Sequence, residues 1–247
     1  MPKPRYIELG TGEKIPILYE DRSVLAIDKP AGWRLLPFAR KSVAGDLQSL
    51  LAAMVAVHEH WARSRNLKFI RHLHRLDAET TGVLLFAKSQ GAIRPYSELF
   101  EGRNMTKVYL AVVSGSPKEE EWTCKLKLSR ELDEMGRIYV HGPDTREAET
   151  RFRVLQRHKN KTLLLGFPVT GRTHQIRVHL SKTGLPILGD LVYGGPSTGK
   201  RDSMALRSVA LAFPDPFSGR RVEIRAPVSE FVATYQFSPL TTPVPLR

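Results

Sequence analysis

A polar turn placed directly ahead of an apolar strand is the feature of this sequence that most constrains its fold. The run Val83–Ala87 has the length and the apolar, partly branched composition of a buried β-strand, and Gly82 before it permits close backbone approach. Asp77 therefore lies at the mouth of a predicted strand. A carboxylate flanked by Arg75 and by threonine hydroxyls can be held ionised, which suits a nucleophile better than a proton donor. A simple turn cap is the alternative, since Asp and Thr are favoured in turns for local reasons.

Several segments along the chain resemble the sequence boxes of one family, the RluA family of RNA pseudouridine synthases. The resemblance is carried, in family order, by Asp28–Gly32, His74–Asp77 with Thr80–Gly82, Lys107–Val113, Gly171–His179, Gly189–Asp190 and Tyr193–Gly194. It implies an α+β catalytic fold with a central mixed, largely antiparallel sheet and flanking helices. It also implies an RNA pseudouridine synthase, an enzyme that isomerises specific uridines in structured tRNA or ribosomal RNA without a cofactor or metal.

The resemblance implies roles for individual residues. Asp77 matches the family's catalytic nucleophile, Tyr109 the tyrosine that stacks on the uracil and handles a proton, and Arg177 the arginine that pairs with the catalytic carboxylate. Arg75 is expected to stabilise the RNA once the target base has left its stack. The residues expected to meet RNA phosphates or position the nucleotide are Arg172, Thr173, His174 and Gln175.

Blander interpretations of these positions remain open. Without the resemblance, Tyr109 is a core tyrosine of a strand and Arg177 one exposed cation among many. Lys29 and Lys107 also lie in matching boxes, but each can be a solvated charge on a sheet edge, so neither is included among the site residues. Leu206–Ser208 departs from the Leu-His-Ala that is common in the family. The alternative function is a non-catalytic RNA-binding or RNA-chaperone protein on the same scaffold.

Composition favours an anionic partner. The 38 Lys and Arg residues exceed the 25 Asp and Glu residues, and the resulting net charge of +13 attracts polyanions, of which nucleic acid is the leading candidate. Apolar stretches fall short of the ~20 residues of a membrane span, and the first residues lack a signal-peptide pattern. We therefore expect a soluble cytoplasmic protein with no membrane partner. The single cysteine, Cys124, is expected to be a small hydrophobe in a strand.

Two other kinds of site were considered. His58 with His60 and His72 with His74 form His-x-His pairs, which bring two imidazoles to one face of a strand. Because residues two apart diverge on a helix, and His58 and His60 fall on a predicted helix, we expect no metal site. Asp77 with Glu79 is poorly placed as a glycosidase pair, whose carboxyl groups must flank a sugar.

Periodicity and turn signals predict a sheet-rich chain. A helix begins at a Ser42 cap and runs through Val57, a second at 89–100 is kinked or broken near Pro95, a third is capped by Thr173, and a last one by Ser229. Strands are predicted at 15–19, 24–27, 83–87, 106–113, 123–129, 148–156, 162–169, 206–213 and 220–225, with a hairpin turn at His158–Lys161.

We expect one catalytic domain over residues 14–237. A polar lead-in covers 1–13, and a Pro-rich tail, loose or docked, covers 238–247. An S4-type RNA-binding domain is not expected, and a monomer is the expected state. The basic loops at Arg34–Lys41 and His158–Lys161 are candidates for RNA contacts.

Overall fold

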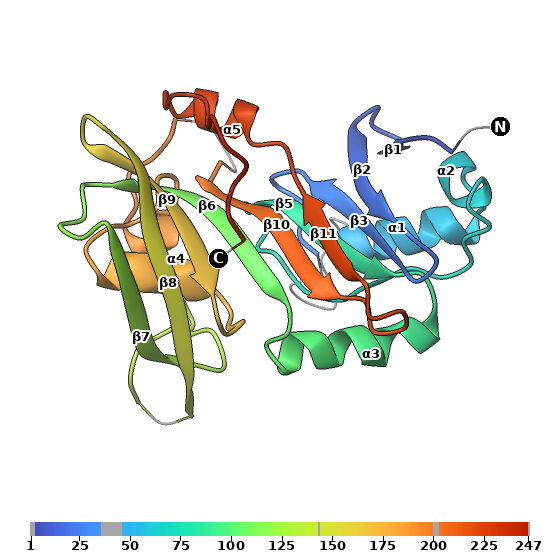
Figure 1. Ribbon diagram of the computed structural model, residues 1–247, viewed down its shortest axis with the longest axis horizontal. Helices are drawn as coiled ribbons and strands as arrows, with labels where there is room; N and C mark the ends of the chain where they lie inside the picture. Colours follow the sequence, from blue (N-terminus) through green and yellow to red (C-terminus); the bar gives the residue numbers. More distant parts are fainter. Residues whose placement is uncertain (1–2, 36–45, 143, 200–202, 247) are drawn as a thin grey trace. The chain divides into compact units, whose positions relative to one another are not determined.

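The computed structural model describes residues 3–35, 46–142, 144–199 and 203–246 (Figure 1). These residues form two compact units. The first unit contains Met1–Met105 and Phe213–Ala226, and the second contains Thr106–Ala212 and Pro227–Arg247. The first unit is therefore assembled from two segments that are far apart in the sequence.

The first unit is built on an antiparallel sheet. Its strands follow the order β1 (Tyr6–Glu8), β2 (Lys14–Glu20), β3 (Val24–Lys29) and β5 (Thr81–Ala87), with β4 (Arg71–His72) also paired to β5. Strands β2, β3 and β5 confirm the predictions, whereas β1 lies in the segment interpreted as a polar lead-in. The register pairs Lys29 with Gly82, so the end of β3 lies beside the start of β5.

Three helices and one further strand complete the first unit: α1 (Leu47–Ala56), α2 (His60–Arg63), α3 (Gln90–Glu101) and β11 (Arg221–Arg225). The Asp46 carboxylate caps α1 by accepting from the Ser49 amide at 2.8 Å, and the predicted cap Ser42 lies outside the described residues. Helix α3 continues through Pro95 instead of breaking there (Figure 1). Its residues Ala92 and Tyr96, on either side of Pro95, are buried, and this packing favours the continued helix.

The predicted helix does not extend to His58. Helix α1 ends at Ala56, and His58 has a φ of 56°, a left-handed conformation that is incompatible with a continuing α-helix. His60 begins the separate helix α2. The prediction that His58 and His60 lie on the same helix is therefore wrong.

The second unit contains the longest strands. Its strands are antiparallel and follow the order β10 (Leu206–Pro214), β6 (Thr106–Ser114), β9 (Lys161–Pro168), β8 (Thr145–His158) and β7 (Glu121–Ser129). Of β10, the residues up to Ala212 belong to this unit. The predicted hairpin is confirmed, since His158 pairs with Lys161. A register shift between Val154 and Gln156 marks a bulge in β8, which increases the local twist.

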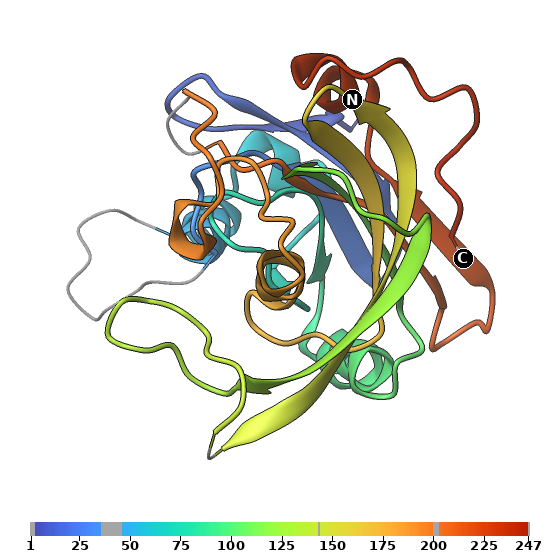
Figure 2. The same ribbon diagram turned by 90° about the vertical axis from the view of Figure 1, so that its left-hand side faces the viewer.

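The second unit contains helices as well. Helix α4 (Gln175–Lys182) lies against β7, β8 and β9, and Figure 2 shows it, in orange, on the inner side of the curved strands. A 3₁₀ turn, η1 (Leu191–Tyr193), and helix α5 (Ser229–Thr234) follow. The predicted cap residues were wrong by one position: His174 precedes α4 in place of Thr173, and Val228 precedes α5 in place of Ser229.

The C-terminal tail is docked at its start. The Ser238 amide donates to Gln156 Oε1, and Gln156 Nε2 donates to the Ser238 carbonyl, both at 2.9 Å. Cys124 is buried in β7, as predicted. No helix among the described residues has both the length and the apolar character needed to cross a membrane.

Candidate active site

Asp77 occupies a turn that leads into β5. The turn is closed by the Thr80 amide, which donates to the Asp77 carbonyl at 3.2 Å. Asp77 itself is half-buried, Thr80 is buried, and Thr81 is the first residue of β5. The predicted position of this carboxylate at the mouth of a buried strand is confirmed.

The ammonium group of Lys29 holds the Asp77 turn from inside. Its Nζ donates to the carbonyls of Ala78 at 2.8 Å, Thr80 at 3.0 Å and Pro30 at 2.9 Å, and the residue has no exposed surface. Burial lowers the pKa of Lys29 to about 8, and the carboxylates of Glu79 and Asp77 act in the opposite direction. At neutral pH a largely protonated ammonium therefore lies behind the turn.

The solvated-charge interpretation of Lys29 is therefore wrong. Lys29 ends a strand in which Val24–Ile27 are fully buried, and the register carries it alongside Gly82. Because side chains alternate between the two faces of a strand, Lys29 shares the face of the buried Ile27, which is a signal that its side chain enters the interior. Three carbonyl acceptors offset the cost of that burial.

The box around Asp77 divides into inward and outward side chains. The Leu85 amide donates to His74 Nε2 at 3.1 Å, the His74 ring stacks on Phe100, and Leu76 is buried. Arg75, by contrast, is exposed. The box is thus anchored through the alternate residues His74 and Leu76, and Arg75 between them lies at the surface.

Arg177 lies in the interior of the second unit. Its Nε donates to Asp190 Oδ2 at 2.7 Å and its Nη2 to Asp190 Oδ1 at 2.8 Å, a two-pronged arrangement that fixes the plane of the guanidinium. The guanidinium carbon also lies 5.1 Å from the centre of the Tyr193 ring. Only 5% of Arg177 is exposed, so the interpretation as one exposed surface cation is wrong.

Asp190 is a residue that the sequence analysis did not assign to the site. It lies in the Gly189–Asp190 box, and glycine is required at 189 because a Cβ there would stand 2.0 Å from the Ser203 carbonyl oxygen. Gly189 also has a φ of 82°. The tight backbone at this box places the Asp190 carboxylate opposite Arg177.

Tyr109 lies in the middle of β6 with small neighbours on both sides. It is opposite Gly166 in β9 and Ser208 in β10, and 9% of it is exposed. The departure at Leu206–Ser208 thus lies beside Tyr109, where Ser208 is fully buried.

Gln175 organises the loop ahead of α4. Its Oε1 accepts from Thr170 Oγ1 at 2.7 Å and from the Arg172 amide at 2.9 Å, while its Nε2 donates to the Glu149 carbonyl at 2.9 Å and to Thr150 Oγ1 at 3.0 Å. These four bonds use the whole hydrogen-bonding capacity of the amide. Gln175 therefore determines the path of the Arg172–His174 loop.

Lys107 supports the same loop from β6. Its Nζ donates to the Thr170 carbonyl at 2.9 Å. Burial, with a smaller contribution from Arg172, lowers the pKa of Lys107 to about 8. Lys107 is half-buried and, like the fully buried Lys29, donates to backbone carbonyl oxygen, so its interpretation as a solvated edge charge is also wrong.

His174 is held in a strained conformation by Tyr193. Its φ of 54° and ψ of 17° are left-handed, which is uncommon for a residue other than glycine. Its Nδ1 lies 2.8 Å from the Tyr193 hydroxyl, and that hydroxyl accepts from the Ile138 amide at 2.7 Å. The Tyr193 hydroxyl therefore joins His174 to the loop between β7 and β8.

The predicted site residues thus form two groups. Asp77 and Arg75 belong to the first unit, and Tyr109, Arg177 and the Arg172–Gln175 loop belong to the second. The pairing of Asp77 with Arg177 stays a prediction. Among the described residues, no three His, Cys, Asp or Glu side chains gather as metal ligands.

The order of these boxes along the chain matches a known protein family. A model of the RNA pseudouridylate synthase family matches residues 23–182, which is more than half of the chain. The chain belongs to this family. The match includes Asp28–Gly32, Asp77, Tyr109 and Arg177. The resemblance to RluA-type pseudouridine synthases is confirmed.

Curated relatives and solved structures agree with family membership. The ribosomal large subunit pseudouridine synthase C of Vibrio parahaemolyticus is 33% identical over 219 residues, covering 86% of this chain and 65% of the relative. The protein of the same name from Escherichia coli strain K12 is 34% identical over 223 residues, covering 87% of this chain and 66% of the relative. The chain thus spans slightly less than two thirds of the length of these relatives.

Two human structures share the fold. Human RNA pseudouridylate synthase domain containing 1 superposes with a TM-score of 0.68 at 28% identity, covering 90% of this chain and 86% of that chain. Human RNA pseudouridylate synthase domain containing 4 has a TM-score of 0.70 at 22% identity, covering 88% and 90%. The predicted α+β pseudouridine synthase fold is confirmed.

Proposed function

We propose that this chain isomerises specific uridines to pseudouridine in ribosomal RNA, with Asp77 as the nucleophile. The observation that carries the proposal is the Asp77 turn of a pseudouridylate synthase family member: a half-buried carboxylate at the mouth of a buried strand, backed by the Lys29 ammonium. The substrate class is supported by relatives whose names specify the large ribosomal subunit.

The reaction is an isomerisation, so uridine and pseudouridine have the same atomic composition, and few catalytic groups are needed. The N1–C1′ bond of uridine breaks, the uracil rotates, and a C5–C1′ bond forms, after which C5 loses its proton to solvent and N1 gains one. The Asp77 carboxylate acts at the sugar, either by adding to it or by generating a glycal intermediate. Tyr109 stacks on the detached uracil and handles a proton.

Arg177 is proposed to orient the Asp77 carboxylate and keep it ionised. Asp190 and the Tyr193 ring hold the guanidinium of Arg177, so its position does not depend on substrate. Preorganised charge of this kind lowers a barrier without reorganisation during the reaction. Arg75, Arg172, Thr173 and His174 are proposed to contact RNA, with Gln175 shaping their loop.

The proposal is tested by tritium release from C5-labelled uridine in ribosomal RNA and, separately, in tRNA. We expect release from ribosomal RNA with the wild type, and a loss on the order of a thousandfold or more with Asp77→Asn, because the nucleophile is removed. RNA affinity is expected to persist, since phosphate contacts dominate binding. Glu79→Gln is the control, because it removes a second carboxylate that acts on Lys29.

Each other outcome has a defined meaning. Full release by Asp77→Asn, with Glu79→Gln equally active, would remove Asp77 from the mechanism. Release from tRNA alone would change the proposed substrate. No release from either RNA by folded wild-type protein that binds both would support the non-catalytic RNA-binding alternative.

A further inference from the structure

The segment that leads to the Asp77 turn concentrates positive charge. Residues 60–76, here called the basic segment, contain five Arg or Lys residues and three His residues and no Asp or Glu. The chain has 25 acidic residues, and none of them falls within this stretch. It ends immediately before Asp77.

The basic segment is ordered, and it presents its cations from a fixed scaffold. Its apolar residues are buried at intervals, namely Trp61, Ala62, Leu67, Ile70 and Leu76. Strand β4 within it pairs with β5, Arg71 lying opposite Ala87. The cations between these anchors are therefore held at defined positions on the first unit.

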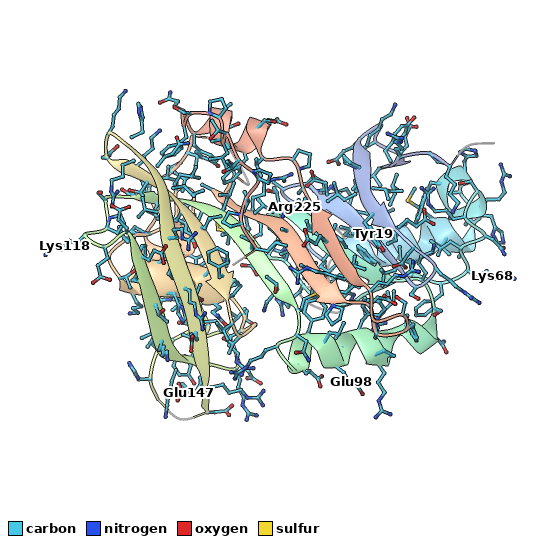
Figure 3. All side chains as sticks on the ribbon, in the orientation of Figure 1. Tyr19, Lys68, Glu98, Lys118, Glu147 and Arg225 are labelled. Carbon is cyan, nitrogen blue, oxygen red and sulfur yellow. The ribbon has the colours of Figure 1, made fainter. Side chains whose placement is uncertain are left out.

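Four of the five cations are exposed, and the fifth is structural. Arg65 donates to Glu20 Oε2 at 2.9 Å and to the Pro4 carbonyl, and only 3% of its side chain is exposed. The exposed cations are Arg63, Lys68, Arg71 and Arg75. None of these four forms an ion pair with a described Asp or Glu. Lys68 extends outward from the first unit in Figure 3.

The charge along β7 and β8 is arranged differently. Lys125 pairs with Glu149 at 3.4 Å, Lys127 with Glu147 at 3.6 Å and Arg153 with Glu121 at 2.6 Å. The charge of each of these cations is thus balanced by a glutamate. One of these glutamates, Glu147, is labelled in Figure 3. Because these glutamates cancel the positive potential of the neighbouring cations, this surface is a poor polyanion site.

We propose that Arg63, Lys68 and Arg71 of the basic segment bind the phosphate backbone of the RNA and, with Arg75, lead it toward Asp77. This inference rests on the proposed function and adds the surface that the substrate follows. Burial and the nearby charges of Arg71 and Arg75 lower the pKa of His72, which is consistent with a positive potential here. Uncompensated exposed cations release counterions when they neutralise phosphates, so they contribute directly to affinity.

The test compares two variants of equal charge. The first carries Arg63→Gln, Lys68→Gln and Arg71→Gln, and the control carries Lys125→Gln, Lys127→Gln and Arg153→Gln. Both are made in the Asp77→Asn protein, so binding is measured without turnover. The probe is an in vitro transcript of large-subunit ribosomal RNA, and its affinity is measured by filter binding across a salt series.

We expect the slope of log affinity against log salt to become shallower by about 2 to 3 for the basic-segment variant, close to one for each lost phosphate contact. We expect its affinity at low salt to fall at least about tenfold below that of the control. Equal slopes for the two variants would overturn the proposal. Tritium release by the protein with Asp77 intact is scored separately, so failure of the catalytic proposal remains distinguishable.

Folding is checked independently. Five of the six substituted residues are exposed, and Arg153 is half-buried. The midpoint of thermal unfolding of each triple variant should stay within a few degrees of the parent, since substitutions of exposed side chains usually change stability little. Should the basic-segment triple unfold early, the three single variants replace it. Their slopes should each fall by about one, and unchanged slopes would again overturn the proposal.

Discussion

At the residue scale, the buried polar side chains differ in whether they have hydrogen-bond partners. Lys29 has three carbonyl acceptors, and Arg177 has both oxygens of Asp190. His179, in α4, is also fully buried, yet among the described residues neither of its ring nitrogens has a hydrogen-bond partner. Burial without a hydrogen-bond partner disfavours the charged imidazolium strongly and the neutral imidazole mildly.

The imidazole of His179 should make the protein sensitive to acid. Burial lowers its pKa to about 4 from 6.5, so the folded state binds fewer protons than the unfolded state between these values. Stability is then fully present above pH 6.5 and falls as the pH drops through about 4, by about 3 kcal/mol from this group. We expect His179→Leu to flatten this part of the pH profile of urea unfolding.

The His179→Leu variant has a second expected effect. At pH 7 it should be at least as stable as the wild type, because it removes two buried nitrogens that have no partner in the described structure. An unchanged pH profile between 6.5 and 4 would show that His179 does not titrate there.

At the element scale, α4, η1 and the loop between β7 and β8 are joined through one residue. Tyr193, at the end of η1, contacts His174 and the Ile138 amide through its hydroxyl and Arg177 through its ring. Its carbonyl accepts from Ser181 Oγ at 2.8 Å. These contacts make Tyr193 a positioning residue for the start of α4.

Tyr193→Phe separates the hydroxyl from the ring. The ring can still lie against Arg177, but the Ile138 amide loses its acceptor, worth about 1 kcal/mol. We therefore expect hydrogen exchange at Ile138 to accelerate by roughly fivefold to tenfold, with amides of β9 unchanged as the internal reference. Exchange at Ile138 equal to that of the wild type would show that the loop is held by other contacts.

At the scale of the whole chain, the first unit is completed by the segment Phe213–Ala226, which comes late in the sequence and packs against α3. The Tyr96 hydroxyl donates to Asp215 Oδ2 at 2.6 Å across 119 positions of sequence, and its ring packs against Phe213 and Phe217. Burial raises the pKa of Tyr96 well above its usual value, with Asp215 adding to the shift. The hydroxyl therefore remains a donor throughout the accessible pH range.

Tyr96→Phe tests this closure. We expect it to lower the free energy of unfolding by about 1 to 3 kcal/mol, because a buried carboxylate oxygen loses its donor. Tyr19→Phe is the matched control: Tyr19 also donates to a carboxylate, Asp21 at 2.9 Å, but it is half-exposed and the partner is two residues away. Urea unfolding should show the smaller loss for Tyr19→Phe, and equal losses would contradict the closing role of Tyr96.

Much of the secondary structure followed from local pattern. The apolar run Val83–Ala87 forms β5, the alternation from Thr106 forms β6, and the hairpin at His158–Lys161 was predicted at its observed position. These features depend on residues close in sequence, whose periodicity and turn chemistry specify a strand or a turn directly. The short sequence boxes are local patterns as well, and their order along the chain predicted the family.

Only the tertiary structure decided which side chains are enclosed and which partners they meet. Lys29 binds a carbonyl 51 positions away, Arg177 meets Asp190 13 positions on, and Tyr193 meets Ile138 across 55 positions. A lysine or arginine has the same local pattern whether it faces water or a neighbouring strand. Its burial, its pKa and its role depend on the register and packing of distant segments, which local pattern alone does not specify.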